Sequence, residues 1–577
     1  MNRLLLYART LSHLKASQLV YLYLRRGLPR ISRQHRPTEV FRRQKIGIQK
    51  SLPLTQSSGG DYRFVFLNQS MEFSKGQIDW VCKDMPKLWR YNLHYFDFLQ
   101  DPHRSTEGRS LVISDWIEHN PLGTQDAWEP YAASLRIVNW VKFFLSLSIV
   151  PVEKGGGGDG HVPDPLSEVL NAEWLKSLYL QALWLEQNIE FHFLANHYLK
   201  NGVALFFAGM FFEGRDAERW LKKGLKILCE ELEEQFLADG AHFERSPMYH
   251  SISVVDFVDV LNLMRSSNQA MVFAEMDHMR AKTVQALNFL HDICLPDGDI
   301  PLFNDSAFGI APSPSRIFDY AKQAIGYEPP AYPMDLSTYA KSASGYYVIR
   351  KGGDMMVIDC GPIGPDYNPA HAHCDTLSYE LSLNGRRVIV DSGVYDYEPS
   401  LQRAYARSTK AHNTVVVDGQ EQSEMWGVFR VARRAKPLFA RLTNPGDGHV
   451  KFEGAHDGYR RFSGQVIHER SVEFDGFSTW IVKDDIQGNG THSLESYVHL
   501  HPDCTFTQTG QRILVSDQRG LPLFCLEIVG PGESRVEEGW YFPEFGVERK
   551  KHVVVFTRTG PLPLSLSYRI TKASESS

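Results

Sequence analysis

The sequence predicts a multidomain protein with an N-terminal α/α barrel or toroid followed by a C-terminal antiparallel β-sandwich. Two patterns lead to this fold class. Apolar residues recur at helical spacing from Trp80 to about Tyr320, and they alternate with polar residues after position 340. Prolines within 326–335 break the helical pattern, so we place a linker there. The expected units are a basic extension (1–75), the toroid (76–325), the linker (326–340) and the sandwich (341–577).

Composition sets limits on the class of protein. With 577 residues, 43% of them apolar and 12% aromatic, the chain can fill several large cores. Its net charge of −6 gives no overall electrostatic footprint for nucleic acid. The longest apolar run, 203–212, is too short to cross a bilayer. The seven cysteines are scattered without C-x-x-C spacing, which argues against a disulfide framework.

The basic extension differs in charge from the rest of the chain. Its first 50 residues carry twelve Lys/Arg against one acid, Glu39. The start reads as one amphipathic helix whose apolar face carries Leu4, Tyr7, Leu11 and Leu14, and which ends at Gly27 and Pro29. A solvated basic surface is the favoured interpretation. Contact with an anionic glycan, a membrane surface or the acidic remainder of the protein stays open.

The toroid contains two segments with unusual polar residues. Asn196 and His197 interrupt an apolar segment, where polar groups must be paired or face a cavity; helix capping and a role in a cleft are equally compatible. Ser246 and Pro247 suit the N-cap and first position of a helix, which places Tyr249 in the first turn at the positive end of the helix dipole.

Three further interpretations concern the charged and aromatic neighbours of these segments. Arg245 and His250 flank Tyr249 and are expected to favour its phenolate, as acid–base chemistry near neutral pH would need. Trp128, Glu129, Tyr131 and Arg136 begin a helix and suit either stacking on sugars and gripping carboxylates or plain packing. Asp297, Asp299 and Asp305 lie in a turn-rich loop, as structural turn residues or as paired acids.

A β-hairpin in the sandwich begins and ends with metal-binding residue types. Positions 377–383 alternate as in a half-buried strand, Asn384-Gly385 favours a two-residue type I′ turn, and 386–390 form the return strand. His371 and His373 precede the hairpin, Asp391 follows it, and His412 comes later. Imidazoles with a carboxylate form a first shell that suits zinc. The regular register would leave His373 about 16 Å from Asp391 at ~3.3 Å per residue, so the chain must fold back for them to meet.

These segments together resemble the heparinase II/III-like polysaccharide lyases, a group to which alginate lyases are similar. The resemblance runs from about residue 92 to the end and is most specific at "HAHCDTLSYEL", "VIVDSGVYDY" and "HNTVVVDG". It implies an N-terminal incomplete (α/α) toroid and a C-terminal antiparallel β-sandwich, with the site in the cleft between them. It also implies that Asn196 neutralises a substrate carboxylate beside His197, that Tyr249 and His371 are catalytic, and that His373, Asp391 and His412 bind a structural zinc ion.

The implied reaction is β-elimination from a uronic-acid-containing glycan. Arg245, Trp128, Glu129 and Arg136 are the expected substrate contacts, and an anionic polysaccharide or oligosaccharide is the expected partner. The resemblance implies the cell envelope or periplasm, but no signal peptide is visible, so the cytoplasm also stays open. Whether the chain forms a homodimer is open as well.

Two other functions remain open at this point. One is a glycoside hydrolase on an α/α toroid, with its acid pair drawn from Asp239, Glu244 and Asp299. The other is a non-catalytic glycan-binding or assembly protein of an exopolysaccharide pathway.

Overall fold

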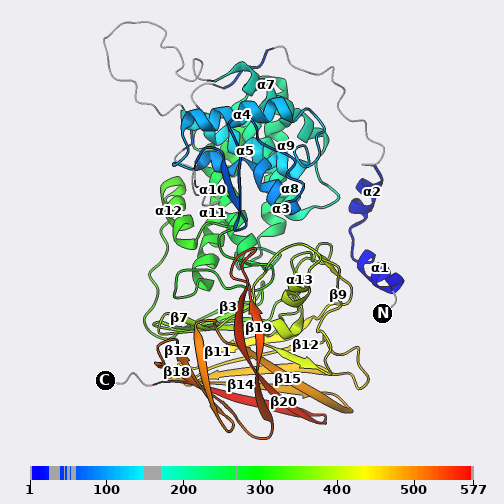
Figure 1. The fold of residues 1–577 in the computed structure, drawn as a ribbon, viewed down its shortest axis with the longest axis vertical. Helices are drawn as coiled ribbons and strands as arrows, with labels where there is room; N and C mark the ends of the chain where they lie inside the picture. Colours follow the sequence, from blue (N-terminus) through cyan, green and yellow to red (C-terminus); the bar gives the residue numbers. More distant parts are fainter. Residues whose placement is uncertain are drawn as a thin grey trace.

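The chain folds into a helical domain stacked on a domain of antiparallel sheets (Figure 1). The computed structural model describes residues 3–24, 39–43, 46–48, 52, 60–147, 170–267, 269–446 and 448–573. The last helix of the upper domain, α12, ends at Ile325, and the first strand of the lower domain, β3, begins at Ser337. This arrangement confirms the predicted fold class. None of the helices within the described ranges is long and apolar enough to span a membrane.

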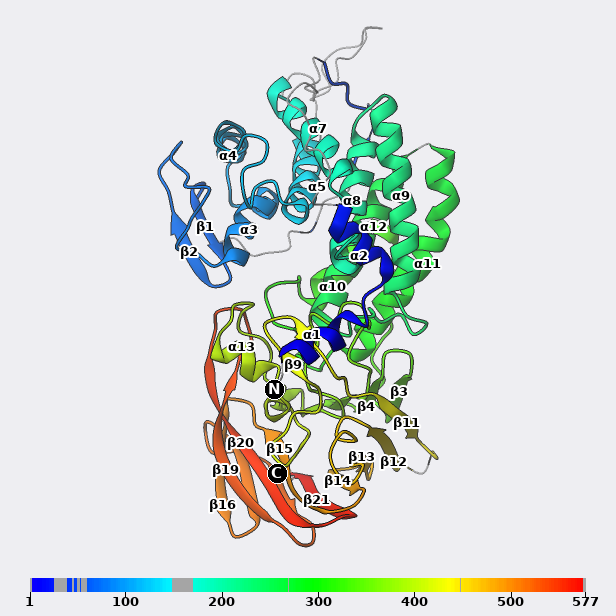
Figure 2. The same cartoon turned by 90° about the vertical axis from the view of Figure 1, so that its right-hand side faces the viewer.

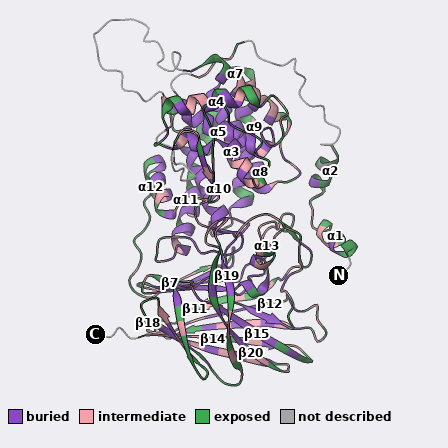
Figure 3. Cartoon of the chain, viewed as in Figure 1, coloured by how far each residue is buried: buried purple, intermediate pink, exposed green. Residues whose placement is uncertain are grey.

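The helical domain is built around two almost completely buried helices. Its longer helices are α3 (Lys87–Tyr95), α4 (Thr106–His119), α5 (Pro130–Ser146), α7 (Ala172–Gln187), α8 (Ala195–Phe211), α9 (Arg215–Gln235), α10 (Pro247–Met264), α11 (Ala270–Ile293) and α12 (Pro314–Ile325), with the 3-10 turn η1 (Asp97–Gln100) and the hairpin β1 (Arg63–Phe66) and β2 (Gln69–Glu72). Every residue of α10 and every residue of α8 except His197 is buried, so both helices lie inside the domain (Figure 3). A Cβ on Gly209 would lie 2.3 Å from the backbone of Leu221, so this glycine lets α8 and α9 pack closely.

The lower domain contains three large antiparallel sheets, where the sequence suggested two. The five-stranded sheet has β3 (Ser337–Lys341), β4 (Tyr346–Lys351), β5 (Asp354–Asp359), β6 (Tyr379–Leu383) and β7 (Arg386–Ile389) in that order. The eight-stranded sheet has β11 (Pro437–Thr443), β12 (Val450–His456), β13 (Ile467–Phe474), β14 (Thr479–Gln487), β21 (Leu564–Lys572), β18 (Pro522–Ile528), β17 (Arg512–Asp517) and β16 (Cys504–Thr509). The four-stranded sheet has β19 (Glu533–Tyr541), β20 (Arg549–Pro561), β15 (Thr491–His499) and β8 (Val415–Val417).

The five-stranded sheet is covered on both faces. Val348 and Val357 pack against Phe289 of α11, in a cluster that joins the two domains. Alternate residues such as Ile349 and Met356 pack instead with the other sheets. Every residue of β6 is therefore buried, although the alternation had suggested a half-buried strand.

The hairpin β6–β7 has the predicted two-residue turn. Asn384 and Gly385 both have positive φ, 51° and 80°, and Leu383 pairs with Arg386. The register shifts between Leu381 and Ser382, an irregularity that the alternation of residues does not reveal. Short elements follow the hairpin: α13 (Leu401–Ala406), η3 (Thr409–Ala411), β9 (Met425–Trp426) and β10 (Arg430–Val431).

The start of the chain forms two helices rather than the expected one, α1 (Arg3–Leu11) and α2 (Ala16–Leu24). Leu6 is the buried residue of α1. Leu4, Tyr7 and Leu11, which belong to the expected apolar face, are exposed. Figure 2 shows α1 beside β9 of the lower domain and α2 beside the helical domain. Gly27 and Pro29, the expected helix end, lie outside the described residues.

Candidate active site

A cavity of about 1160 Å³ lies between the helical domain and the sheets. Its wall contains Asn196 from α8, Tyr249 from α10 and His371 from the loop between β5 and β6. These three residues are the ones on which the sequence-based proposal of a shared crevice depended. The fold therefore brings an amide, a phenol and an imidazole from distant parts of the chain to one cavity.

Tyr249 owes its position to the start of α10. Ser246 accepts a hydrogen bond from the Tyr249 backbone N–H at 3.2 Å, and Pro247 takes the first helical position, as predicted. The phenol ring stacks on the imidazole of His371, with 3.9 Å between ring centroids and 15° between planes. Its hydroxyl lies 3.1 Å from the hydroxyl of Tyr397.

The phenol of Tyr249 is held in its neutral form, contrary to the expectation from its sequence neighbours. Burial raises its pKa well above the ordinary value, and the nearby Tyr397 adds to this shift. Arg245 does not oppose the shift, because its guanidinium donates to the carbonyls of Phe243 and Ser344. The ring of His250 forms its hydrogen bonds with backbone groups, the N–H of His242 and the carbonyl of Ala286. Tyr249 is consequently a proton donor at neutral pH.

His371 is oriented by a buried glutamate. Its Nδ1 forms a hydrogen bond with Oε2 of Glu244, the residue five positions before Tyr249. Burial alone would raise the pKa of Glu244, but the charge and hydrogen bond of His371 outweigh burial and lower it. Glu244 is thus an anion that fixes Nδ1 of His371 as the protonated nitrogen. Within the described ranges Nε2 has no hydrogen-bond partner, so it is available to accept a proton.

Asn196 enters the cavity from a strained helix start. Leu194 and Ala195 have positive φ, 58° and 50°, a conformation that costs free energy in residues with side chains. The Asn196 Nδ2 donates to the hydroxyl of Tyr131 at 3.0 Å, and its buried Oδ1 has no partner among the described residues. His197 also lines the cavity and places Nδ1 3.1 Å from Oε1 of Glu190.

The predicted substrate contacts separate into one residue in the cavity wall and three outside it. Glu129 lines the cavity. Arg136 is completely buried, stacks on Trp116 and donates to Gln181 and to backbone carbonyls. The indole of Trp128 donates to the Asn120 carbonyl, away from the cavity. Trp128, Arg136 and Arg245 therefore serve packing and chain connections, the alternative that the sequence had left open for the first two.

A group of candidate metal ligands lies beside the cavity in the lower domain. Ligand atoms of His373, Asp375 and His412 lie within 4.8 Å of one another, and all three residues are buried. Nδ1 of His373 and Nε2 of His412 have no hydrogen-bond partner among the described residues. Asp391, the expected carboxylate ligand, instead accepts a hydrogen bond from Nδ1 of His412 at 2.7 Å. Two unpaired imidazole nitrogens beside a carboxylate fit a zinc ion, with Asp391 orienting one of the ligands.

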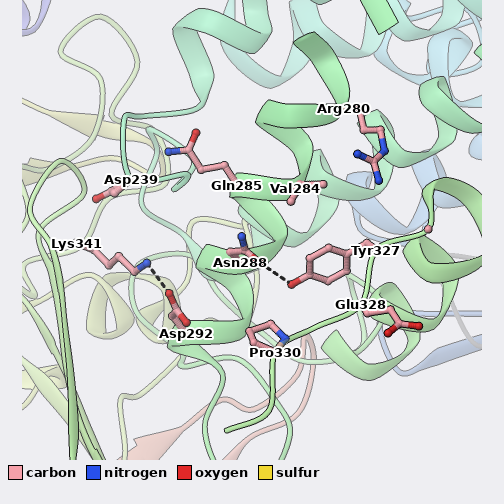
Figure 4. A pocket seen from close by; sticks show the side chains of 11 residues that line it. Asp239, Arg280, Val284, Gln285, Asn288, Asp292, Tyr327, Glu328, Pro330 and Lys341 are labelled. Atoms are coloured by element: carbon pink, nitrogen blue, oxygen red, sulfur yellow. Dashed lines mark hydrogen bonds and ion pairs between the residues drawn. The ribbon is translucent and has the colours of Figure 1, made fainter. Parts of the chain in front are cut away.

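A second hollow of about 800 Å³ lies between α11 and the linker (Figure 4). Its charged residues are mostly used in structural contacts. Lys341 pairs with Asp292, and Asp239 accepts hydrogen bonds from the backbone and side chain of Ser344. Asp239 is thereby separated from Glu244 and Asp299, which line the main cavity.

Two residues of the site were not found from the sequence. The sequence suggests Glu244 as an acid of a hydrolase but gives no sign of its contact with His371. Tyr397 has no spacing that distinguishes it from a structural tyrosine, although it lies within the segment "VIVDSGVYDY" that carried the resemblance.

Comparisons with known proteins cover both domains. The family model described as Heparinase II/III N-terminus matches residues 15–321, and that described as Heparinase II/III-like, C-terminal matches residues 339–571. The heparin-sulfate lyase of Pedobacter heparinus is 29% identical over 516 residues, which span 83% of this chain and 72% of that protein. The heparin-sulfate lyase of Bacteroides stercoris is 23% identical over 475 residues, which span 73% and 65% of the two chains. The crystal structure of heparinase III has the same fold, with a TM-score of 0.68 and 18% identity over 87% of this chain and 80% of that one.

Proposed function

We infer the function from the family: the chain belongs to the heparinase II/III proteins, because models of both domains of that family match it. It is a polysaccharide lyase. We propose that it cleaves a glycosaminoglycan at a uronic acid by β-elimination, with Asn196, Tyr249 and His371 as its catalytic residues. The observation that supports this assignment is that these three side chains line one cavity.

The reaction removes the C5 proton of a uronate, breaks the bond between C4 and its glycosidic oxygen, and forms a C4=C5 double bond. Loss of the C5 proton adds negative charge next to a carboxylate, so a hydrogen-bond donor at that carboxylate lowers the barrier. Asn196 is the proposed donor, with His197 beside it. A single donor of this kind contributes on the order of 3 kcal/mol.

The two rings of the stacked pair take opposite parts in proton transfer. His371 accepts the C5 proton at Nε2, because Glu244 holds the other ring nitrogen in its protonated form. Tyr249 donates its proton to the leaving oxygen, because burial keeps its phenol neutral. Tyr397 holds the phenol of Tyr249 through the contact between their hydroxyls.

We propose that His373, Asp375 and His412 hold a zinc ion with a structural role. Its charge would tie together the loop that carries His371 and the segment that carries His412. His371 precedes His373 by two residues, so a rigid position of the second imidazole limits the movement of the first. The reaction steps themselves use the side chains of the cavity.

The relatives named heparin-sulfate lyases support heparan sulfate as the first substrate to test. Purified protein should release an ultraviolet-absorbing unsaturated uronate from at least one of heparan sulfate, chondroitin sulfate, hyaluronan and alginate, and a Tyr249→Phe variant should not. Reducing ends that appear without this absorbance would mean hydrolysis. If none of the four glycans yields an unsaturated uronate or new reducing ends, the proposal is contradicted.

A further inference from the structure

The first two helices form a connection between the domains beside the catalytic cavity. We call residues 3–24 the strap. On the lower domain, Arg9 donates to both carboxylate oxygens of Glu424, at 2.9 and 3.0 Å. Trp426 of β9 donates to the Thr10 hydroxyl at 3.1 Å and meets the Tyr7 ring edge-on at 4.7 Å. Three different interactions therefore attach α1 to the segment that contains β9.

The other end of the strap is attached to the helical domain. Lys15 pairs with Glu234 of α9, and the Gln18 side chain donates to the His192 carbonyl at 3.3 Å. The Tyr21 ring stacks on Phe191 at 4.5 Å. The strap thus spans the two domains, as Figure 2 shows. The cations Arg9 and Lys15 bind acids of the protein itself, one of the alternatives that the sequence had left open.

The strap is also part of the cavity wall. Thr10, Leu14 and Gln18 line the same cavity as the catalytic residues. A second connection closes another flank, where Asn68 at the tip of the β1–β2 hairpin donates to the Glu544 side chain and the Phe545 carbonyl, both at 3.0 Å. Figure 2 shows this hairpin and the strap on different flanks of the helical domain. A long polysaccharide bound at an internal position must leave the site in both directions, and each connection removes space for it.

We propose that the strap determines where the lyase acts on its substrate: it favours chain ends and short oligosaccharides over the interior of long polymers. This inference rests on the proposed function. Substrate of limited length fits within the walled cavity, whereas an internal segment of a polymer requires the strap to leave its position.

Charge reversal at the lower anchor tests this selectivity. In Arg9→Glu, a carboxylate faces Glu424 and the strap should detach. The double variant Arg9→Glu/Glu424→Arg restores an opposite-charge pair, and Lys15→Glu detaches the other anchor independently. A matched control is Arg441→Glu, which breaks an ion pair with Glu453 between β11 and β12, strands that contribute no residue to the cavity wall. Initial rates are measured by ultraviolet absorbance on polymeric heparan sulfate and on a heparan sulfate tetrasaccharide.

The ratio of the polymer rate to the tetrasaccharide rate shows whether the strap restricts the lyase to chain ends and short substrates. We expect it to rise severalfold in Arg9→Glu and Lys15→Glu, to return toward the wild-type value in the double variant, and to stay unchanged in Arg441→Glu. Size-exclusion chromatography should show long polymer persisting late in the wild-type reaction. If the ratio is unchanged in both strap variants while product is still released, only the proposed role of the strap is overturned, and the proposed function stands. If the wild type releases no unsaturated product from these or the other uronate glycans, the proposed function is overturned, and this inference with it.

Discussion

The imidazole of His371 stacks on the phenol ring of Tyr249, 3.9 Å between centroids, although the two residues come from different domains. The stack joins the start of α10 to the loop that leads into β6. A proton acceptor and a proton donor therefore occupy one position in the cavity wall, and their separate roles follow from their surroundings: Glu244 orients the imidazole, and burial keeps the phenol protonated.

Removal of the Tyr249 hydroxyl should abolish most of the activity. In Tyr249→Phe the leaving oxygen loses its proton donor, a contribution of about a hundredfold to ten-thousandfold in rate. Tyr397→Phe is the matched control in the same cavity. It removes one neutral hydrogen bond, about 1 kcal/mol, and should lower kcat far less. Equal losses of kcat in the two variants would contradict the assignment of Tyr249 as the acid.

The Glu244 carboxylate should control the pH dependence of the reaction. His371 lowers the pKa of Glu244, so the wild-type carboxylate orients the imidazole until the pH falls through that lowered pKa. Glu244→Gln has no carboxylate to protonate, so the acidic limb of the kcat/KM profile should lose this contribution and move to lower pH, while kcat falls because the ring is no longer oriented. Glu190→Gln changes the other buried glutamate–histidine pair of the cavity, with His197, and should leave this limb in place. A limb that stays fixed in Glu244→Gln would exclude His371 as the base oriented by Glu244.

Substitutions at Asn196 should separate neutralisation of the substrate carboxylate from simple packing. Asn196→Ala removes the donor. The activation free energy should rise by on the order of 3 kcal/mol, so kcat/KM should fall a hundredfold or more. Asn196→Asp keeps the shape but places an anion toward the carboxylate, so its loss should be larger. Asn92→Ala changes an amide elsewhere in the cavity wall and should be mild. Higher activity in the aspartate variant than in the alanine variant would contradict the proposed role.

The zinc proposal can be tested without measuring activity. Elemental analysis should find close to one zinc per chain in the wild type and little in His412→Ala, with a lower Tm because a metal that binds only the folded state stabilises it. His492→Ala is the control, since His492 forms a comparable 2.7 Å hydrogen bond with Asp418 outside the ligand group. Full zinc content in His412→Ala would contradict the proposed zinc site.

Local sequence signals predicted local structure well. Ser246 and Pro247 begin α10, and Asn384-Gly385 forms the turn of β6–β7, because each feature depends on the backbone preferences of adjacent residues. The toroid and sandwich followed from the change in periodicity near residue 330. The convergence of Asn196, Tyr249 and His371 required the resemblance to a family, since no spacing relates residues of separate domains.

Features set by tertiary burial were harder to predict. Glu129 precedes α5 as its N-cap and Arg136 lies within α5, but only Glu129 reaches the cavity, because Arg136 faces the interior of the helical domain. Asp375 replaces Asp391 in the group of candidate ligands because the chain before β6 folds back toward His412, which the regular hairpin register could not reveal. For Tyr249, burial raises the pKa, although the sequence neighbours Arg245 and His250 had suggested a phenolate.

The proposed mechanism requires one uronate residue to contact Asn196 and His371 at the same time. A crystal structure of Tyr249→Phe with a substrate tetrasaccharide tests it most directly, because the variant should bind without cleaving. We predict a uronate carboxylate within hydrogen-bond distance of the Asn196 amide and C5 of that sugar facing Nε2 of His371. A tetrasaccharide bound in the hollow lined by Asp239 and Asp292, or in the main cavity with its uronate turned away from Asn196, would contradict it.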